Sequence, residues 1–238
     1  MLACVGDGDV NDASDEQARM REQITFYREQ ARQHPPIEDD DRMKGLLRSY
    51  WEDPEVQHLV RSYCPPSARA LELASGAGRW TGALLDVCQR ITAVDASVEM
   101  HEINRSRHGD ARIEYVVADL FEYQPDDHFD LIFAGYWLSH VPPGRFGHFW
   151  LMLRGALAAE GRVVMVDDGV RDPHGTEHFA DDPTGGADRR RLPDGRQFTI
   201  VKVAYAPQDL EARLADLGWR AAVAQLTPAT YVVSAQPV

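Results

Sequence analysis

The stretch LELASGAGRWT, residues Leu71 to Thr81, joins a short apolar run to a segment with helical spacing. The run over residues 68–74 ends in small side chains, as expected of a strand buried on both faces. Residues 78–88 then carry apolar side chains at helical spacing. Gly76 and Gly78, at the junction, allow the backbone to approach a ligand closely. The stretch therefore predicts a strand, a glycine turn that contacts a ligand, and a helix.

The same alternation continues toward the C-terminus. Further strands are predicted over 91–95, 113–119, 129–135, 161–168, 220–226 and 230–236, and helices over 97–108, 145–157 and 207–219. Short connections between alternating strands and helices are typical of a parallel sheet with helices on both faces. We therefore predict an α/β fold with seven strands, mostly parallel and with an antiparallel last strand. Residues 189–205 predict a separate hairpin that turns at Asp194-Gly195.

The chain divides into three regions. Residues 1–15 are acidic and weakly patterned, so we expect a disordered lead. Residues 16–66 predict helices over 16–33, 39–51 and 55–63, which form either a packing appendage or a lid over a site. Residues 67–238 form the main domain, and the polar segment 170–188 is expected to be a surface loop.

Composition excludes several classes of protein. The chain has 238 residues and a formal net charge of -13, so nucleic acid and anionic membranes are unfavourable partners. The start MLACVGDGDV lacks the basic and apolar parts of a signal peptide, and Cys4, Cys64 and Cys88 fit neither a disulfide framework nor a zinc pattern. We expect a cytoplasmic protein. The histidines show no metal-ligand spacing, so no metal is predicted.

Acidic side chains lie at three successive predicted strand ends. Asp95 can accept both hydroxyls of a ribose, or it caps the helix 97–108, a role that Ser97 can also fill. Asp119 can accept from an adenine amine while the Leu120 backbone contacts the ring edge, or it begins a turn. Together with Glu72 in the first strand, these carboxylates favour an adenosine site.

The residue at position 81 discriminates between nucleotides. A dinucleotide fingerprint requires a third glycine there, and this chain has Thr81. We interpret this as looser packing and no pyrophosphate cradle, so the adenosine carries no phosphates. An acidic pocket also suits a cationic sulfonium better than a diphosphate.

Four ordered stretches, LELASGAG (71–78), ITAVDAS (91–97), VVADL (116–120) and FDLIFAGYWLSHVP (129–142), resemble the motifs of class I S-adenosylmethionine-dependent methyltransferases. The resemblance covers about residues 22–237 and departs at Ala74, where the family usually has glycine. It implies a Rossmann-like sheet of order 3-2-1-4-5-7-6 and S-adenosyl-L-methionine as cofactor. It also implies a set of cofactor-binding residues: Tyr27, Glu72, Ala74, Ser75, Gly76, Gly78, Trp80, Thr81, Asp95, Ala96, Met100, Asp119, Leu120 and Phe121.

A closer resemblance rests on FYREQA (26–31), ELASGAGRWT (72–81), YWLSHVP (136–142), RRRLPDGRQFTIVKV (189–203) and LADLGW (214–219). These stretches are similar to small-molecule O-methyltransferases of actinobacterial secondary metabolism, including phosphonate O-methyltransferases of the dehydrophos type. The resemblance implies an N-terminal helical lid, an aromatic pair (Phe26 and Tyr27) near the cofactor, and methyl transfer to oxygen.

Methyl transfer depends on positioning the acceptor and excluding water, and a base helps only if the acceptor must lose a proton. His140 is the candidate base. Alternatively it is a structural histidine, or it orients an acceptor that is already anionic. Tyr136 and Trp137 line the acceptor pocket or belong to the core. Arg189 is the candidate substrate-binding residue of the basic stretch Arg189, Arg190, Arg191, Arg196 and Lys202, whose alternative is a solvated hairpin.

The sequence thus predicts methyl transfer to an oxygen (hydroxyl, carboxylate or phosphonate) of a small metabolite by a monomer or homodimer. A small-molecule N-methyltransferase is the close alternative. A nicotinamide (NAD-type) oxidoreductase is disfavoured by Thr81 and Asp119. A non-catalytic regulatory protein that binds the cofactor remains open at this point.

Overall fold

The computed structural model describes residues 7–33, 54–169, 186–227 and 230–238. Its main sheet has the order β3-β2-β1-β4-β5-β9-β8. The strands are β1 (Ser67–Leu73), β2 (Cys88–Asp95), β3 (Ile113–Val117), β4 (Phe129–Gly135), β5 (Leu157–Asp168), β8 (Trp219–Thr227) and β9 (Thr230–Pro237). Only β9 runs antiparallel to both of its neighbours. With the separate hairpin left out of the count, this confirms the predicted order 3-2-1-4-5-7-6.

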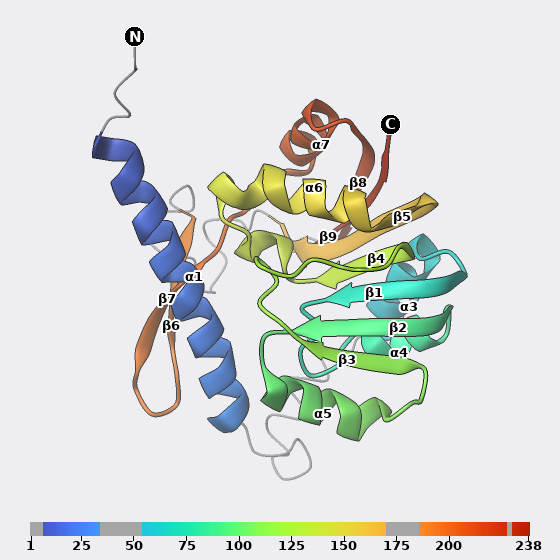
Figure 1. Cartoon of the computed structure of the whole chain (residues 1–238), viewed down its shortest axis with the longest axis horizontal. Helices are drawn as coiled ribbons and strands as arrows, with labels where there is room; N and C mark the ends of the chain where they lie inside the picture. The colour runs from blue at the N-terminus through green and yellow to red at the C-terminus, as the bar shows by residue number, and fades with distance from the viewer. Residues whose placement is uncertain (1–6, 34–53, 170–185, 228–229) are drawn as a thin grey trace.

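The central strands are buried on both faces, and each face has its own helices. Leu131 of β4 belongs to a cluster with Val60 of α3 (Pro54–Tyr63) and Leu84 of α4 (Thr81–Leu85). The next residue, Ile132, packs in the other cluster with Trp150 of α6 (Phe146–Ala156). Helix α7 (Pro207–Asp216) joins α6 on that face, and α5 (Val98–His108) lies beside β2 and β3 (Figure 1). Successive strand residues point to opposite faces, so an unbroken apolar run suits this position.

Helix α1 spans Asp7–Gln33, so residues 7–15 are helical where we expected a disordered lead. Apolar spacing predicted only residues 16–33 of this helix, and its backbone hydrogen bonds continue to Asp7. Helix α4 is shorter than the predicted 78–88 because the glycine loop continues to Trp80. The predicted helix over 39–51 lies outside the described residues.

A hairpin of β6 (Ala187–Arg191) and β7 (Gln197–Val201) forms a second, two-stranded sheet with its turn at the predicted place. Residues 187 and 188 therefore belong to a strand rather than to the expected surface loop, because they pair with 201 and 200. The rest of that loop, 170–185, is outside the described residues. Helix α1 lies along the hairpin, beside the ends to which the arrows of β1 and β2 point (Figure 1).

Helix α1 and the hairpin share a small core of Phe26, Leu192 and Ile200. At its edge, Arg196 of the hairpin turn forms an ion pair with Glu29 at 2.6 Å. We call α1 and β6–β7 together the α1–hairpin unit. Because its two parts are far apart in sequence, the unit exists only once the chain has folded.

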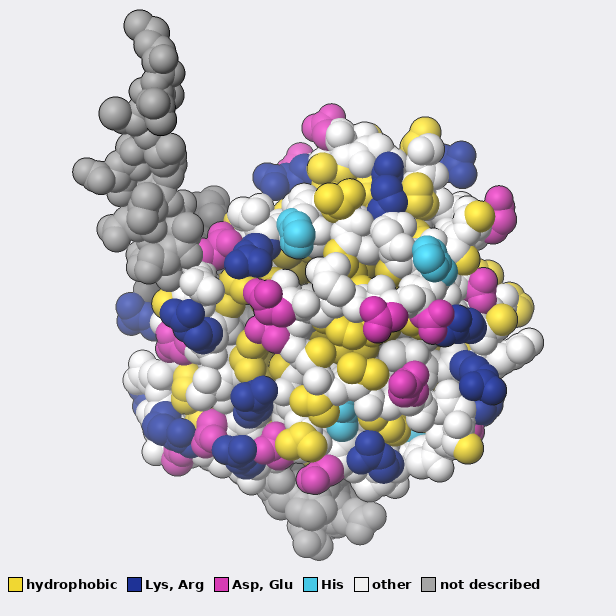
Figure 2. Space-filling view, viewed as in Figure 1, with side chains coloured by type: hydrophobic (Ala, Val, Ile, Leu, Met, Phe, Trp, Pro, Cys, Tyr) yellow, Lys and Arg dark blue, Asp and Glu magenta, His cyan; other side chains and the backbone are white. Residues whose placement is uncertain are grey.

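The surface and the helices bear on possible partners. On the face drawn in Figure 2, acidic and basic side chains are interspersed rather than gathered into a patch of one sign. None of the described helices combines the length and apolar character needed to cross a bilayer.

Candidate active site

The glycine loop after β1 has a strained backbone. Ala74 and Gly76 both have φ of 51°, in the left-handed region, and Gly78 has φ of 83°. A Cβ at Gly76 would meet only the Ala74 carbonyl, at 3.9 Å, whereas at Gly78 it would meet Asn104 Oδ1 at 2.6 Å. Gly76 therefore faces open space in which a ligand fits, and Gly78 allows close packing on α5. An L-residue in the left-handed region costs about 1–2 kcal/mol, so Ala74 is a departure with a physical cost.

A buried polar network supports the loop from below. Thr81 Oγ1 donates to Glu72 Oε2 at 2.7 Å and accepts from Asn104 Nδ2 at 2.9 Å. Tyr115 donates to Asn104 Oδ1 at 3.1 Å. Burial raises the pKa of Glu72 to about 8, against the opposing effect of the Thr81 hydrogen bond. Thr81 is fully buried and tied on two sides, so our interpretation of this position as loosely packed was wrong.

Asp95 links the loop to the start of α5. Its Oδ2 accepts from the Gly76 N–H and its Oδ1 from the Ser97 N–H, both at 2.9 Å. Ser97 Oγ accepts from the Met100 N–H, so Ser97 caps the helix and Asp95 is left for the loop. Burial raises the pKa of Asp95, and these backbone hydrogen bonds partly oppose the rise. Arg28 of α1 donates twice to the Ala96 carbonyl, at 2.8 and 3.1 Å, so α1 reaches the same place.

Beneath the loop, Ser75 contacts a buried histidine of α5. Ser75 Oγ lies 3.2 Å from His101 Nε2, and the His101 ring meets Tyr115 edge-on. Burial lowers the pKa of His101 to about 4, so the ring is neutral. His101 therefore supports the loop and carries no charge toward a ligand.

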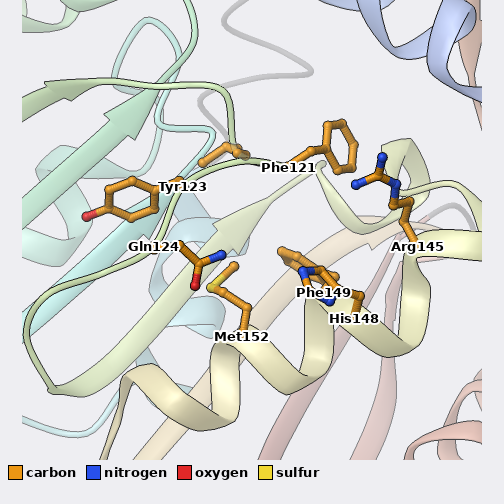
Figure 3. A pocket seen from close by; sticks show the side chains of 8 residues that line it. Phe121, Tyr123, Gln124, Arg145, His148, Phe149 and Met152 are labelled. Carbon is orange, nitrogen blue, oxygen red and sulfur yellow. The ribbon is translucent and has the colours of Figure 1, made fainter.

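Asp119 begins a turn after β3, because its Oδ1 accepts from the Phe121 N–H at 3.0 Å. Leu120 and Phe121 are buried, and Phe121 packs against Trp137 with ring centroids 5.3 Å apart. The same loop borders an opening whose other wall is α6 (Figure 3). That opening is lined by Leu120, Phe121, Tyr123, Gln124, Arg145, His148, Phe149 and Met152.

An aromatic group lies where β1 and β4 end. Tyr136 has φ of 57° and its N–H donates to the Val166 carbonyl at 2.6 Å. Its ring stacks on Trp80 with centroids 6.5 Å apart, and the Arg79 guanidinium lies 4.6 Å from the Tyr136 centroid. A Cβ at Gly135 would meet Trp80 Nε1 at 2.2 Å, so the Trp80 indole fits at this place because residue 135 has no side chain. Strain of this kind at Tyr136 is characteristic of functional sites.

His140 lies in the short helix η1 (Leu138–His140) after β4 and is buried. Its Nδ1 is 2.7 Å from the Val201 carbonyl, and its Nε2 is 3.1 Å from the Tyr27 hydroxyl. A carbonyl only accepts, so Nδ1 carries the proton and Nε2 accepts from Tyr27. Burial and the charge of Lys202 hold the pKa of His140 well below its usual value, whereas burial raises that of Tyr27. Both groups are therefore neutral.

Charged side chains surround His140. Lys202 is buried, and its Nζ lies 2.8 Å from both Ser139 Oγ and Asp168 Oδ2. Asp167 is fully buried and accepts from the Ser139 N–H at 2.9 Å. Burial raises the pKa of Asp167, and Lys202 opposes the rise.

The hairpin directs a different arginine toward His140 from the one we expected. In β6, Arg190 is paired with Phe198 and Asp188 with Ile200, whose side chains pack toward α1. Arg190 forms an ion pair with Asp188 at 2.6 Å and lowers the pKa of His140. Both arginines are exposed, but by strand alternation Arg189 lies on the opposite face of the hairpin from Arg190. The structure therefore does not bring Arg189 to the site.

Most of the predicted residues do converge at the carboxyl ends of β1 to β4. Sequence reasoning missed Gln23 and Arg28, and it named Arg190 and Lys202 only as members of the basic stretch. Alternation in the hairpin could have separated Arg190 from Arg189, because Arg190 shares a face with the apolar Phe198. Among the described residues, no group of three or more His, Cys, Asp or Glu side chains is placed to hold a metal ion.

Comparison with known proteins gives a matching family model and solved structures that the chain resembles. Residues 70–161 match a family model described as a methyltransferase domain. Over 92% of this chain and 97% of the other, the structure resembles a DhpI–SAH complex, with 33% identity and a TM-score of 0.76. A DhpI–SAM–HEP complex matches with a TM-score of 0.75, also at 33% identity and over 92% of this chain and 98% of the other.

Two further matches are more limited. Nodulation protein S of Rhizobium tropici is 38% identical over 68 residues, which are 28% of this chain and 29% of that protein. The glycopeptide N-methyltransferase MtfA, solved with S-adenosyl-L-methionine, matches 77% of this chain and 93% of its own, with a TM-score of 0.56 and 17% identity. At that identity the likeness concerns the fold alone.

The backbone strain at Ala74 predicts that Ala74→Gly does not destabilise the protein. Glycine relieves about 1–2 kcal/mol of backbone strain in the folded protein. It also makes the unfolded chain more flexible, which favours unfolding by roughly 0.4–1 kcal/mol, the smaller of the two effects. Gly76→Ala, at the same φ of 51°, is the matched control and is expected to destabilise by about 1 kcal/mol. Denaturant unfolding measures both. Equal destabilisation by the two substitutions would contradict the strain at Ala74.

The raised pKa of Glu72 predicts a specific pH dependence of stability. The folded protein keeps a proton on Glu72 up to a pKa of about 8, whereas in the unfolded chain Glu72 releases it near 4.5. Between these values the free energy of unfolding falls as pH rises. Glu72→Gln removes the titration and keeps an oxygen for Thr81.

We therefore expect cofactor-free wild-type protein to lose stability relative to Glu72→Gln as pH rises through this window, and the two to converge at its acidic end. Thermal unfolding across the pH range measures the difference. Parallel stability curves would show that Glu72 titrates normally.

Proposed function

Because this chain belongs to the class I S-adenosylmethionine-dependent methyltransferases, we propose that it methylates an oxygen of a small metabolite that is already anionic, a carboxylate or a phosphonate. The observation that carries the proposal is the state of His140. The histidine is neutral, and both of its ring nitrogens are engaged by other parts of the protein. The experiments below ask whether the acceptor has a proton to lose.

In an open α/β sheet a ligand binds in the crevice outside the carboxyl ends of the strands, and the residues at that place in this chain fit S-adenosylmethionine. Asp95, at the end of β2, is placed to accept from ribose hydroxyls, and the open space at Gly76 leaves room beside it. The indole N–H groups of Trp80 and Trp137 are buried and have no hydrogen-bond partner among the described residues. The Trp150 indole N–H, deep in the core, is unpaired in the same way, so the fit to the cofactor rests on Asp95 and Gly76. When bound, S-adenosylmethionine supplies an activated methyl group on a sulfonium.

The protein contributes positioning rather than bond making. Asp95 holds the glycine loop and the start of α5 in one arrangement, which orients the nucleoside side of the crevice. The strained Tyr136 and the stacked Trp80 form a rigid wall at the ends of β1 and β4. Fixed walls of this kind lower the entropic cost of bringing two reactants together.

Among the described residues, the candidate base His140 is already engaged and is not free to take a proton from an acceptor. His140 Nε2 accepts from Tyr27, and Tyr27 remains protonated because burial raises its pKa. An alcohol or an ammonium group would have to lose a proton before or during transfer. A carboxylate or phosphonate oxygen has a lone pair available at neutral pH. The arrangement therefore favours an anionic oxygen over a neutral hydroxyl or an amine.

Positive charge next to His140 supports the same acceptor class. Lys202 and Arg190 both lower the pKa of His140, so both project positive potential onto it. Lysine has three N–H donors, and two of those on Lys202 serve Ser139 and Asp168. We assign the third to the acceptor anion, which also competes with Asp168 for the ammonium group.

The α1–hairpin unit acts in this proposal as a lid. Tyr27 contacts His140 on the acceptor side, and its neighbour Arg28 contacts Ala96 on the cofactor side. A helix that touches both sides of the crevice excludes water and limits the size of the acceptor. The similar DhpI structures are described as complexes with SAH and with SAM and HEP, and they carry more of the argument than the distant N-methyltransferase MtfA.

An acceptor panel tests the proposal. Purified protein is incubated with S-adenosylmethionine and with matched small carboxylates, phosphonates, alcohols and amines, and methylated product is measured by mass spectrometry. We expect turnover with an acid and a methyl ester as product. Turnover with amines alone would identify an N-methyltransferase, and binding of S-adenosylhomocysteine without any turnover would favour a non-catalytic role.

Lys202→Met is expected to raise the acceptor KM by roughly 10- to 100-fold, because a charged hydrogen bond contributes about 1.5–3 kcal/mol. Arg189→Met removes an exposed charge from the opposite face of the hairpin and is the matched control, with wild-type kinetics expected. The affinity for S-adenosylhomocysteine is measured for both variants to separate acceptor effects from cofactor effects. An acceptor KM unchanged by Lys202→Met would remove Lys202 from the acceptor site.

A further inference from the structure

The side chain of Gln23, on helix α1, ties His140 to strand β7. Gln23 is 1% exposed. Its Nε2 donates to the His140 carbonyl at 3.4 Å, and its Oε1 accepts from the Val201 N–H at 3.1 Å. The partner groups fix the orientation of the amide, because a carbonyl only accepts and an N–H only donates. One buried side chain thus holds two backbone segments that are distant in sequence.

The residue that Gln23 holds in β7, Val201, is also the one that accepts the hydrogen bond from the His140 ring. The Val201 N–H donates to Gln23, and the Val201 carbonyl accepts from His140 Nδ1 at 2.7 Å. Tyr27 lies four residues after Gln23, on the same face of α1, and donates to His140 Nε2 at 3.1 Å. Helix α1 therefore contacts His140 twice, at its carbonyl through Gln23 and at its ring through Tyr27. Through Gln23 it also holds the Val201 N–H, beside the carbonyl that aligns the ring.

We propose that Gln23 is a positioning residue that keeps the proton of the His140 ring on Nδ1, so that the acceptor side of the crevice is complete only when α1 is docked on β7. If Gln23 is lost, the Val201 N–H and the His140 carbonyl are buried without partners, which costs about 1–3 kcal/mol each. Relaxation of β7 then moves the Val201 carbonyl away from Nδ1. The role in methyl transfer rests on the proposed function, whereas the effect on the ring does not.

The surroundings of His140 make the position of its proton sensitive to this alignment. Lys202 and Arg190 face it with positive charge, from the residue after β7 and from β6. Asp168, at the end of β5, pairs with Lys202, and Asp167 is tied to the neighbouring Ser139. Tyr27 faces it from α1. If the proton moved to Nε2, the Tyr27 hydroxyl would lose its acceptor, and the Val201 carbonyl would lose its donor.

The test reads the ring directly by NMR of protein labelled with ¹⁵N-histidine and saturated with S-adenosylhomocysteine. The chain has nine histidines, and the His140 signals are assigned by their absence in His140→Phe. In wild type we expect only the Nδ1–H tautomer. Gln23→Leu, and Gln23→Asn with an amide one methylene shorter, are both expected to show a mixture of tautomers. Gln23→Glu keeps the acceptor for Val201 and, when protonated, the donor for His140, so we expect it to retain the single tautomer at acidic pH.

Thr25→Ala is the control on the same helix, because the Thr25 hydroxyl donates within α1, to the Arg21 carbonyl, and has no other hydrogen bond to the described part of the chain. With the acid found in the panel, Gln23→Leu and Gln23→Asn are expected to raise the acceptor KM about tenfold, which corresponds to ~1.4 kcal/mol. The affinity for S-adenosylhomocysteine is expected to change less than about twofold, below ~0.4 kcal/mol.

The proposal is overturned if a folded Gln23→Leu or Gln23→Asn protein keeps only the Nδ1–H tautomer, or if Gln23→Glu loses it as fully as they do. Folding is checked by thermal unfolding against Thr25→Ala, and Gln23→Asn carries the test if Gln23→Leu does not fold. The NMR result needs no acceptor. A panel without turnover on acids, combined with the expected tautomers, would therefore contradict the proposed function alone.

Discussion

The hydrogen bond from His140 Nδ1 to the Val201 carbonyl joins the two halves of the site. His140 follows β4 of the main sheet, whereas Val201 ends the hairpin of the α1–hairpin unit. A single buried hydrogen bond contributes only about 0.5–1.5 kcal/mol to stability, yet a lost partner inside the protein costs more than the bond contributes. The chemistry of the acceptor side depends on this alignment, because it decides which ring nitrogen is protonated and which one faces Tyr27.

The cofactor side is built differently, from short-range structure at the strand ends. The glycine loop, Asp95 and the cap residue Ser97 lie within one strand-loop-helix connection and the strand next to it. The backbone strain on the cofactor side is local too, because it lies at Ala74 and Tyr136, which both have positive φ. The surrounding sheet and the Glu72–Thr81–Asn104 network hold that strain in place. If the α1–hairpin unit acts as the proposed lid, a rigid cofactor side opposite it suits an enzyme that admits and releases two molecules.

Local patterns of sequence determine the cofactor side, whereas contacts between distant segments determine the acceptor side, so the first could be predicted from sequence better than the second. The strand order, the glycine loop and the role of Ser97 follow from local patterns of apolarity and capping, and the structure has them, although β3 ends at Val117, two residues before Asp119. Gln23 carries no comparable signal, because a buried glutamine in a helix looks like any surface glutamine until its partners are known. The choice of Arg189 among the basic residues was uncertain from sequence for a related reason. The basic stretch was evident, but the face of each residue depends on how the hairpin packs against α1, and Arg190 shares a face with Phe198, which packs on that core.

The account requires that methyl transfer proceeds without removal of a proton from the acceptor. The solvent deuterium isotope effect on a single turnover with the best acceptor tests this most directly. For a carboxylate or phosphonate oxygen held by Lys202, with His140 neutral and engaged, we predict an isotope effect close to unity and a rate that does not rise with pH once the acid is ionised. A normal isotope effect clearly above unity, with a rate that increases as a group of the protein loses its proton, would contradict the account.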